Sequence, residues 1–486
     1  MNVSTTAEGN LLAYIDGEPI IYDKGDMAWV AAGTALVTLF VPGLALLYSG
    51  LLRRKNALSM WFLAITVYAL GQLHWMLIGY SLTYSDTGNS FWGNLKWGGL
   101  KGVDINPAPA PTIPALLYAI FQAAFEAITM VVIVAGAAER ARMLPTLIWL
   151  FVWATFVYCP LARWTWDAQG WLYTLGELDF AGGGPVHIAS GVAGFVFCWF
   201  LGPRRGFGTV SLDYRPQSVT NICLGTLLIW MGWTAFNGAC MSAMNLKSAS
   251  CVTNTNIAAS VGALTWIAMD YIFTRKWSAV GACSGVLAGL IGITPAVGYV
   301  SAPGSIGVAA ATAIICNLAT GFKRFVKIDD PVDVGALHMF GGIMGGIMTG
   351  FLAEARVAAF DGTVIEGGWV DHHWKQMGYQ LAGITSIVAW TAVISYLTLL
   401  IINYIPGLRF RVSEDAEIVG IDEAELGEFA YDYLHLRKDI DDARPSLRGR
   451  SPGPAHGMSA PESPEGSKEH VPTGNVEPAM SVTSRA

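Results

Sequence analysis

Long apolar runs alternate with short polar connections along most of this chain. An α-helix rises 1.5 Å per residue, so about 20 apolar residues cross the roughly 30 Å hydrocarbon core of a bilayer. Eleven runs are near this length, and each predicts a transmembrane helix: residues 27–50, 58–83, 113–138, 143–162, 185–202, 218–240, 252–273, 279–298, 304–322, 333–353 and 377–404. The pattern predicts an all-α integral membrane protein.

The same pattern divides the chain into four regions. Residues 1–26 are polar, 27–404 form the eleven-span body, 405–442 form a C-terminal segment, and 443–486 are rich in Pro, Ser and Glu. Residues 443–486 cannot bury enough apolar surface to fold, so we expect a disordered tail there. The first apolar run lacks the short core and cleavage site of a signal peptide, so we expect it to remain as a span.

Composition narrows the class of function. Charged residues are 13% of the chain and AVILMFWYC are 53%, whereas soluble domains carry about 25% charged residues. A soluble enzyme and a disordered scaffold are therefore excluded. The net charge is −7, no basic domain is present, and we expect no nucleic-acid partner. The spans hold no nucleophile–base motif and no Cys/His ligand spacing, so we expect no enzyme activity, metal or cofactor.

Positive charge predicts the orientation in the membrane. Alternate connections between the predicted spans hold thirteen Lys and Arg, whereas the other connections and the N-terminal segment hold seven. The positive-inside rule then places the N-terminus outside the cell and the C-terminal segment in the cytoplasm. One N-glycosylation sequon, at Asn2, lies on the predicted outer side.

Two segments of the chain share a spacing of Asp, His and Gly. Residues 179–194 read DFAGGGPVHIASGVAG and residues 330–345 read DPVDVGALHMFGGIMG, so that His187 and His338 each follow an Asp by eight residues. The histidines are 151 residues and five predicted spans apart. Because five is odd, the two segments cross the membrane in opposite directions. This is typical of a five-plus-five inverted repeat, with the eleventh span added at the C-terminal end and a shared site near the midplane.

The repeat predicts a pore-lining pair of histidines. Two imidazoles related by a pseudo-twofold axis can share a proton between ring nitrogens, because each ring has one donor and one acceptor when neutral. Glycines four and seven residues after each histidine lie on its helix face, so we expect a smooth groove beside each ring, although tight helix packing explains most glycines in the spans. Asp179 and Asp330 are expected to cap and orient the helix starts.

Several further strings resemble the ammonium transporter (Amt/Mep/Rh) family, and most of all the fungal ammonium permeases of the high-affinity type. They cover most of residues 27–432 and occur in order along the eleven spans. The strings are 47–56 (LYSGLLRRKN), 137–142 (AAERAR), 178–183 (LDFAGG), 281–289 (GACSGVLAG), 295–300 (PAVGYV), 328–333 (IDDPVD) and 425–432 (ELGEFAYD).

The resemblance implies a homotrimer in the plasma membrane, with one pore per subunit that conducts ammonium inward. It also suggests a role in ammonium sensing. It assigns roles by motif. Phe121 and Phe125 match the aromatic positions at the outer pore mouth, and Trp166 matches the vestibule tryptophan. Phe125 and Phe236 match the two phenylalanines of the gate, and the two histidines match the paired histidines of the pore.

Two positions depart from the family pattern. Cys240 stands where the family usually has Ser in the outer ammonium site, and a thiol is a weak acceptor. Glu126 follows the gate residue Phe125 in the middle of a span, pointing about 100° away from it. Structural pairing, a role in proton movement, or neither could explain Glu126. His74, in the second span, is expected to be a peripheral packed residue.

These residues predict a mechanism. An ammonium ion at the outer aromatics gains cation–π attraction, and the apolar pore beyond the gate favours loss of its proton. Neutral ammonia then passes along the pore while the proton crosses the histidine pair. K⁺ has no proton to lose, which gives selectivity. The alternatives are an Rh-like channel for neutral gas and an ammonium receptor without significant transport.

The C-terminal segment carries family-like signals to about residue 433 and is expected to dock on the cytoplasmic face. Leu426 stands where many relatives have His, so any coupling through that imidazole is absent. Ser446 and Ser451 lie among arginines, a context that suits a regulatory kinase, and phosphate would add close to −2 charge at each. An unmodified solvated tail is the alternative.

Overall fold

The computed structural model describes residues 3–15, 17–106, 109, 111–209 and 216–431. Within these ranges, ten helices are long and apolar enough to cross a membrane, and the shorter apolar helix α12 completes the set. The predicted all-α membrane fold is confirmed. The small departures from it lie in the N-terminal segment, in the eighth span, and in the backbone geometry near the histidines.

The first half of the body runs from α1 to α9. Its elements are α1 (Lys24–Val37), α2 (Phe40–Leu51), α3 (Ala57–His74), the π-helix η2 (Trp75–Gly79), α4 (Tyr80–Tyr84), α5 (Ala115–Ile133), α6 (Met143–Trp153), the π-helix η5 (Ala154–Tyr158), α7 (Cys159–Trp166), α8 (Trp171–Leu175), the π-helix η6 (Gly183–Ile188) and α9 (Ala189–Leu201).

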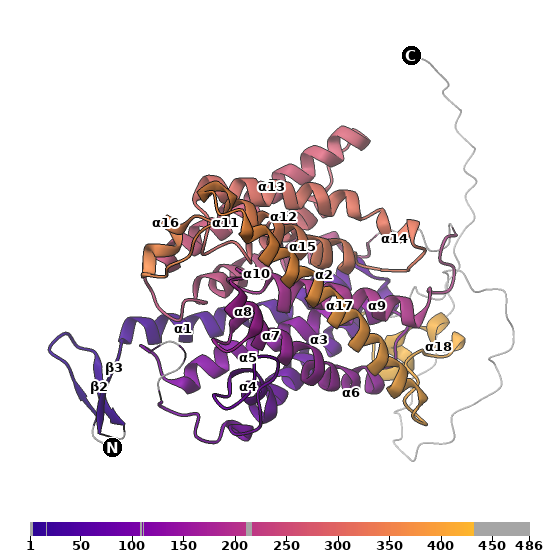
Figure 1. Ribbon diagram of the computed structural model, residues 1–486. Coiled ribbons are helices and arrows are strands. Elements are labelled where there is room, and N and C mark those ends of the chain that lie inside the picture. Colours follow the sequence, from indigo (N-terminus) through magenta and orange to yellow (C-terminus); the bar gives the residue numbers. More distant parts are fainter. Residues whose placement is uncertain (1–2, 16, 107–108, 110, 210–215, 432–486) are drawn as a thin grey trace, which may run out of the picture. The chain divides into compact units, whose positions relative to one another are not determined.

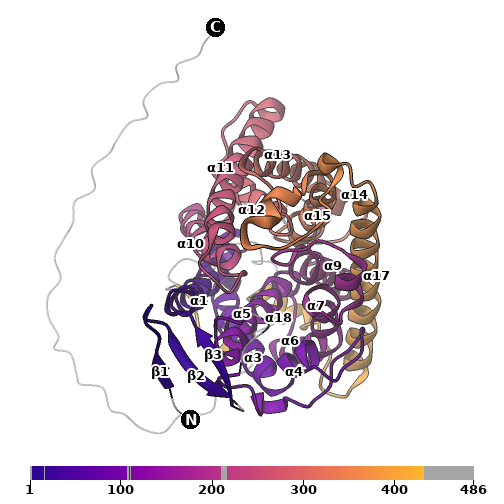
Figure 2. The same ribbon diagram turned by 60° about the vertical axis from the view of Figure 1, so that its left-hand side comes forward.

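The second half runs from α10 to α15, and α17 follows it. Its elements are α10 (Val219–Gly238), α11 (Leu246–Thr274), α12 (Ala279–Ile293), α13 (Ala302–Ala319), α14 (Phe322–Phe325), the π-helix η8 (Gly335–Met339), α15 (Phe340–Leu352), α16 (Ala355–Ala358) and α17 (Lys375–Tyr404). In Figure 2, helices α10 to α13 lie together on one side of the body, and α3, α4 and α6 lie on the other.

The two halves meet along α2 and α10, where glycine lets the backbones approach. A Cβ added to Gly225 of α10 would lie 2.5 Å from the backbone oxygen of Gly43 in α2, and one on Gly43 would lie 2.7 Å from the Ile229 side chain. Small residues permit such close helix contacts in a membrane, where lipid offers no hydrophobic drive for association. The pairing therefore fixes the first half of the chain against the second.

The eighth predicted span is shorter than expected. Helix α12 has 15 residues and ends at Ile293, whereas the apolar run continues to residue 298. Pro295 lies two residues beyond its end, and proline both lacks an N–H donor and clashes with a preceding helical turn. The residues after Ile293 form turns, and the Pro295 carbonyl accepts a hydrogen bond from the Phe180 N–H at 3.0 Å. The break thus connects α12 to the segment that precedes His187.

The N-terminal segment contains a small antiparallel sheet that the search for bilayer-length runs does not predict. Strands β1 (Val3–Thr5), β2 (Leu11–Ile15) and β3 (Glu18–Tyr22) pair in the order β1-β2-β3, with Leu11 opposite Tyr22. The β2–β3 turn contains Gly17 at φ +89°, a conformation that glycine adopts readily. In Figure 1, β2 and β3 lie at one end of the helical body and α18 (Glu414–Val419) lies at the other.

The C-terminal segment docks at the end of the body that carries α18. Backbone hydrogen bonds join Arg142 N–H to the Phe410 carbonyl at 2.7 Å and Val412 N–H to the Arg140 carbonyl at 3.1 Å. The segment then continues through α18 to the π-helix η11 (Asp422–Leu426), where the Asp422 side chain bonds to α3. These contacts tie residues 410–426 to connections that the charge pattern predicts to be cytoplasmic.

Candidate functional site

The two histidines of the sequence repeat lie together in the centre of the body. His187 Nδ1 and His338 Nδ1 are 3.4 Å apart, and both side chains are buried. The His187 ring also stacks on Trp233, with ring centroids 5.1 Å apart and planes 27° apart. Two facing Nδ1 atoms can share one hydrogen, since either nitrogen can be donor or acceptor. The pair can therefore carry a proton from one ring to the other.

Each histidine lies in a π-helical segment rather than in a regular α-helix. His187 is in η6 and His338 is in η8. The extra residue in a π-helical turn displaces side chains from their α-helical positions, and such segments are frequent at functional sites. The matched backbone geometry repeats the matched sequence spacing in both halves of the chain.

The two aspartates of the repeat bind the backbone at the start of these segments. The Asp179 carboxylate accepts hydrogen bonds from the N–H groups of Gly182, Gly183 and Gly184 at 2.6–2.8 Å. The Asp330 carboxylate accepts hydrogen bonds from Val334 N–H at 3.1 Å and Gly335 N–H at 2.9 Å. A helix N-terminus leaves its first N–H groups without intrahelical partners, so these carboxylates stabilise the segments in which the histidines lie.

The prediction of a groove beside each imidazole is wrong, because residues of the other repeat fill that space. A Cβ added to Gly191 would lie 2.2 Å from the Met339 nitrogen, and one on Gly342 would lie 2.9 Å from the Ile188 side chain and 2.8 Å from the Gly183 oxygen. Each glycine, four residues after its own histidine, thus contacts the residue that follows the other histidine. These glycines bring the two repeats together and so bring the rings within reach of each other.

Four aromatic side chains pack together at one end of the site. Phe125 and Phe236 stack with centroids 4.0 Å apart and planes 20° apart. Phe121 lies 5.1 Å from Phe125, and Trp166 meets Phe125 edge-on at 6.1 Å. Both members of the Phe125–Phe236 stack are 1% exposed.

Two polar groups of the predicted vestibule, the indole N–H of Trp166 and the thiol of Cys240, donate hydrogen bonds to backbone carbonyls. Trp166 Nε1–H donates to the Asp179 carbonyl at 3.1 Å, and the Cys240 thiol donates to the Phe236 carbonyl at 3.0 Å. Trp166 and Cys240 are both partly exposed. Because the S–H hydrogen of Cys240 already bonds to this carbonyl, Cys240 can offer a cation only its sulfur atom, and sulfur is a weak acceptor.

A cavity of about 130 Å³ begins behind the stacked phenylalanines. Its wall contains Phe236, both histidines, Asp333 and Thr320, and the remaining lining is largely aliphatic and aromatic. His187 Nε2 has no hydrogen-bond partner within the part of the chain that the structure describes. A small neutral molecule fits such a cavity, and His187 can accept a proton there.

A cluster of buried polar side chains lies outside the cavity, and the sequence indicates its members but not their contact. His74 is 0% exposed rather than peripheral, and its Nδ1 lies 2.6 Å from Glu126 Oε1. The two residues are 52 positions apart, on helices α3 and α5, so no local spacing predicts their contact. The one available signal is that both are ionisable residues inside apolar spans, where a partner is expected.

All three predicted modification sites lie outside the described residues. They are Asn2, Ser446 and Ser451. Leu426 is described, at the end of η11, and packs partly buried against the apolar core.

Comparisons with known proteins agree with one another. The profile of the Ammonium Transporter Family matches residues 28–431. Ammonium transporter 1 of Schizosaccharomyces pombe is 42% identical over 429 residues, which cover 88% of this chain and 85% of that protein. Ammonium transporter MEP2 of Saccharomyces cerevisiae is 42% identical over 419 residues, covering 85% and 84%. The crystal structure of Candida albicans Mep2 superposes with a TM-score of 0.79 at 42% identity, covering 88% of this chain and 94% of that one.

Proposed function

This chain belongs to the ammonium transporter family, as its sequence strings predict, and we propose that it is an ammonium permease that separates the ion into ammonia and a proton inside the membrane. The observation that carries the proposal is the order of three features. The aromatic stack of Phe125 and Phe236 closes the outer side, an apolar cavity follows, and the His187–His338 pair lies in its wall.

The cation binds first on the outer side of the stack. Trp166, Phe121 and Phe125 present ring faces and edges there, and each cation–π contact contributes about 0.5–2 kcal/mol according to how far the ion is desolvated. Cys240 adds one weak acceptor. This site recruits ammonium from dilute solution and brings it to the gate.

Loss of the proton follows from the character of the cavity. An apolar environment disfavours a charged amine by up to about 3–5 pKa units when the amine is fully buried. An N–H bond of the ion breaks, the nitrogen keeps the bonding pair, and neutral ammonia continues through the cavity. The unpartnered His187 Nε2 accepts the proton, and the Nδ1–Nδ1 contact passes a proton on to His338. K⁺ cannot become neutral in this way, so it is rejected.

The cellular setting of the permease is part of the proposal. Relatives at about 42% identity are fungal ammonium transporters. We assign this chain to the plasma membrane as a homotrimer, with its N-terminus outside and its C-terminal segment in the cytoplasm. The charge pattern supports this orientation. A kinase that modifies Ser446 or Ser451 would act on the same side as the docked segment 410–426.

Ammonium-evoked current on a solid-supported membrane tests the proposal. Purified protein in liposomes is expected to give a current with ammonium and none with K⁺. His187→Ala and His338→Ala are each expected to reduce the current by about 100-fold, a typical contribution of a positioned proton-transfer group. Wild-type protein that admits neutral amine but gives no current would favour a gas channel instead, and protein that gives neither would overturn the permease.

A further inference from the structure

A polar cluster buried outside the cavity has no role in the permeation route described above. Its centre is Glu126 of α5 and His74 of α3, both 0% exposed, and neither lines the cavity. A carboxyl group inside a membrane span is costly, and such groups commonly mark proton relays or ion pathways. Glu126 therefore calls for an explanation beyond packing.

The hydrogen bonds of the cluster form a chain. Glu126 Oε1 lies 2.6 Å from His74 Nδ1, and His74 Nε2 lies 2.9 Å from the Thr155 hydroxyl oxygen. That hydroxyl also lies 3.0 Å from the Phe151 carbonyl, which can only accept a hydrogen bond. The Cys159 thiol donates weakly to Glu126 Oε2 at 3.7 Å. Both ring nitrogens of His74 are thus paired.

This chain is satisfied in two protonation states. In the first state, the Thr155 hydroxyl donates to the Phe151 carbonyl, and His74 Nε2–H donates to the Thr155 oxygen. A second proton then lies in the 2.6 Å contact between His74 Nδ1 and Glu126. The pair is then net neutral. If the hydroxyl turns and donates to Nε2, His74 Nδ1–H donates to an ionised Glu126, and the pair has net charge −1. Rotation of one hydroxyl therefore accommodates the gain or loss of one proton.

The surrounding backbone is shaped to hold this pair. His74 directly precedes the π-helix η2, Thr155 lies in the π-helix η5, and Cys159 follows η5. A Cβ added to Gly79, at the end of η2, would lie 2.9 Å from Glu126 Oε2 and 3.2 Å from His74 Nδ1. The glycine leaves room for the carboxyl group. The pore histidines also lie in π-helical segments, so the two sites share this departure from regular helix.

The spacing suits a proton better than a metal ion. Ligand atoms of His74, Glu126 and Cys159 lie within 4.8 Å of one another, as a three-ligand site requires. Zinc holds nitrogen and oxygen ligands at about 2.0–2.2 Å each, which places neighbouring ligands of a tetrahedron about 3.3 Å apart. The 2.6 Å contact between Nδ1 and Oε1 is shorter than this and matches a strong hydrogen bond to a charged group.

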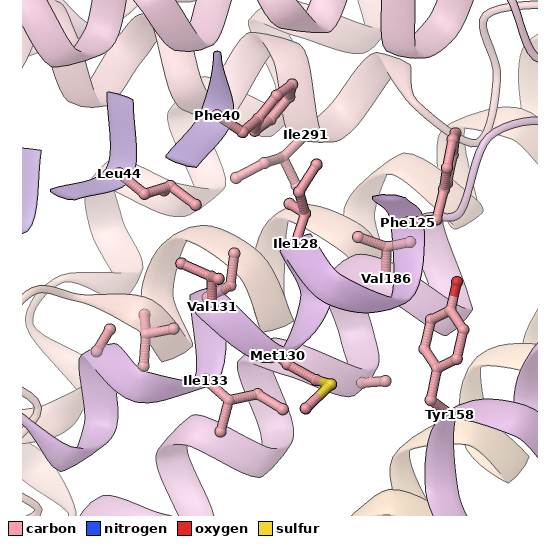
Figure 3. Packing of buried hydrophobic residues seen from close by; sticks show 14 of the residues in the cluster. Phe40, Leu44, Phe125, Ile128, Met130, Val131, Ile133, Tyr158, Val186 and Ile291 are labelled. Atoms are coloured by element: carbon pink, nitrogen blue, oxygen red, sulfur yellow. The ribbon is translucent and has the colours of Figure 1, made fainter. Parts of the chain in front are cut away.

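A buried hydroxyl connects the pair with the gate. Tyr158 is 0% exposed, and its hydroxyl has no hydrogen-bond partner among the described residues. Tyr158 is the chain neighbour of Cys159, whose thiol donates to Glu126 Oε2 at 3.7 Å, so the backbone holds Tyr158 next to the pair. Figure 3 shows the hydroxyl of Tyr158 pointing from its helix toward the region of Phe125. A buried polar atom without a partner is available to ammonium or to water.

We propose that Glu126 and His74 form a proton-binding site beside the gate, which takes up the proton of ammonium through the Tyr158 hydroxyl and stores it while ammonia passes. This inference rests on the proposed function, because it assigns a destination to the proton that the permease must remove. It adds residues that the pore itself does not contain, on the side of α5 that faces α3.

The transfer balances without another reactant. An N–H bond of ammonium breaks, and nitrogen keeps the bonding pair and leaves as ammonia. The Tyr158 hydroxyl has no direct hydrogen bond to Glu126, so the relay includes one bridging water. The ammonium proton joins the Tyr158 oxygen as that hydroxyl passes its own proton through the water to Glu126, and the pair goes from net charge −1 to zero. Beyond Thr155 the chain ends at the Phe151 carbonyl. The site therefore has one entrance, and the proton returns through Tyr158 to the cavity, where the histidine pair carries it onward.

Ammonium-evoked current measured as a function of outer pH tests this site in the full-length protein in liposomes. Glu126→Gln keeps the shape of the side chain but cannot ionise, and Tyr158→Phe removes the connection but leaves the pair intact. Each is expected to lower the current about 100-fold and to change its pH profile. The groups that face Glu126 are His74 from α3, Thr155 and Tyr158 from η5, and Cys159 from α7.

Thr129→Val is the matched control, because Thr129 lies one turn further along α5, is 0% exposed and donates its hydroxyl to the Phe125 carbonyl. It is expected to retain both the current and the pH profile. Infrared difference spectra give a second readout, because ammonium should alter the band of a protonated carboxylic acid in wild type and Tyr158→Phe should suppress that change. The band itself should be missing in Glu126→Gln.

The outcomes separate this inference from the proposed function. If wild type gives a current, and Glu126→Gln and Tyr158→Phe give the same current and pH profile, the proton site is overturned. The proposed permease function is then unaffected. Equimolar bound metal in purified wild type, lost in Glu126→Gln, also overturns it. Wild type without any ammonium transport overturns the proposed function itself. A Glu126→Gln protein that fails to fold leaves Tyr158→Phe as the deciding variant.

Discussion

The carboxylate of Asp422 caps helix α3 through the backbone of Ser59. Its oxygens accept hydrogen bonds from Ser59 N–H at 2.7 Å and from the neighbouring Leu58 N–H at 2.9 Å. Helix α3 begins at Ala57, so these are N–H groups that have no partner within the helix. The docked C-terminal segment thus completes the first turn of the helix that ends at His74.

Removal of this cap is expected to loosen the C-terminal segment. Asp422→Ala should cost about 1 kcal/mol, the usual effect of losing a capping side chain. Hydrogen exchange should then become faster at Leu58 and Ser59, and limited proteolysis within residues 410–426 should increase. Asp415→Ala is the control, because Asp415 is an exposed residue of α18. Equal rates of hydrogen exchange and proteolysis in the two variants would show that the cap does not hold the segment.

Acid should weaken an ion-pair cluster near the docked segment. Burial alone would raise the pKa of Glu139, but Arg204 at 2.7 Å and Arg53 at 2.9 Å lower it from 4.5 to about 2. The ionised carboxylate therefore contributes stability above pH 4.5, and this is lost as pH falls toward 2. The difference corresponds to about 3 kcal/mol.

Glu139→Gln tests this pH dependence. The variant should be less stable than wild type at neutral pH, and the gap should close as pH falls through this window, because wild type then loses the same ion pairs. Thermal unfolding in detergent at a series of pH values measures it. Parallel curves for the two proteins would contradict a lowered pKa at Glu139.

Alanine at Gly191 is expected to disrupt the histidine pair. Its Cβ would lie 2.2 Å from the Met339 nitrogen, so the backbone next to His338 must move. Overpacking of this kind commonly costs about 1–3 kcal/mol. Gly378→Ala in α17 is the control, because its Cβ meets nothing within 4 Å and alanine favours helix by about 1 kcal/mol. Thermal stability and ammonium current should fall in Gly191→Ala and persist in Gly378→Ala.

Serine at position 240 is expected to strengthen the outer cation site. A hydroxyl oxygen accepts a hydrogen bond from ammonium better than the sulfur of Cys240 does, and one bond to a charged group contributes about 1.5–3 kcal/mol. Cys240→Ser should lower the ammonium concentration for half-maximal current about ten-fold. Cys198→Ser is the control, because that thiol lies in α9 and bonds to the Gly136 carbonyl, away from the vestibule. An unchanged concentration dependence would exclude Cys240 from the site.

The sequence predicts the fold and the position of the histidines because both depend on regular spacing. Apolar runs of bilayer length give the spans, and the Asp-to-His distance repeats in both halves, so His187 and His338 can be paired without coordinates. The residues that cap each segment follow from the same repeat, since Asp179 and Asp330 lie eight residues before the histidines.

The remaining features depend on contacts that spacing does not encode. His74 and Glu126 meet across two helices, and each looks isolated along its own span. A π-helical turn differs from an α-helical one by a single residue, so apolar periodicity does not reveal it in η6 or η8. The groove expected from Gly191 and Gly342 is wrong for the same reason, because the partner that fills it comes from the other half of the chain.

The reciprocal contacts of Gly191 and Gly342 have a consequence for biosynthesis. During translation, the first five spans enter the bilayer before residues 335–342 have been made. Gly191 then has no Met339 to pack against, and His187 has no second ring. The first half therefore remains in the lipid with its central segment incomplete, and the histidine pair can form only when the tenth span is inserted.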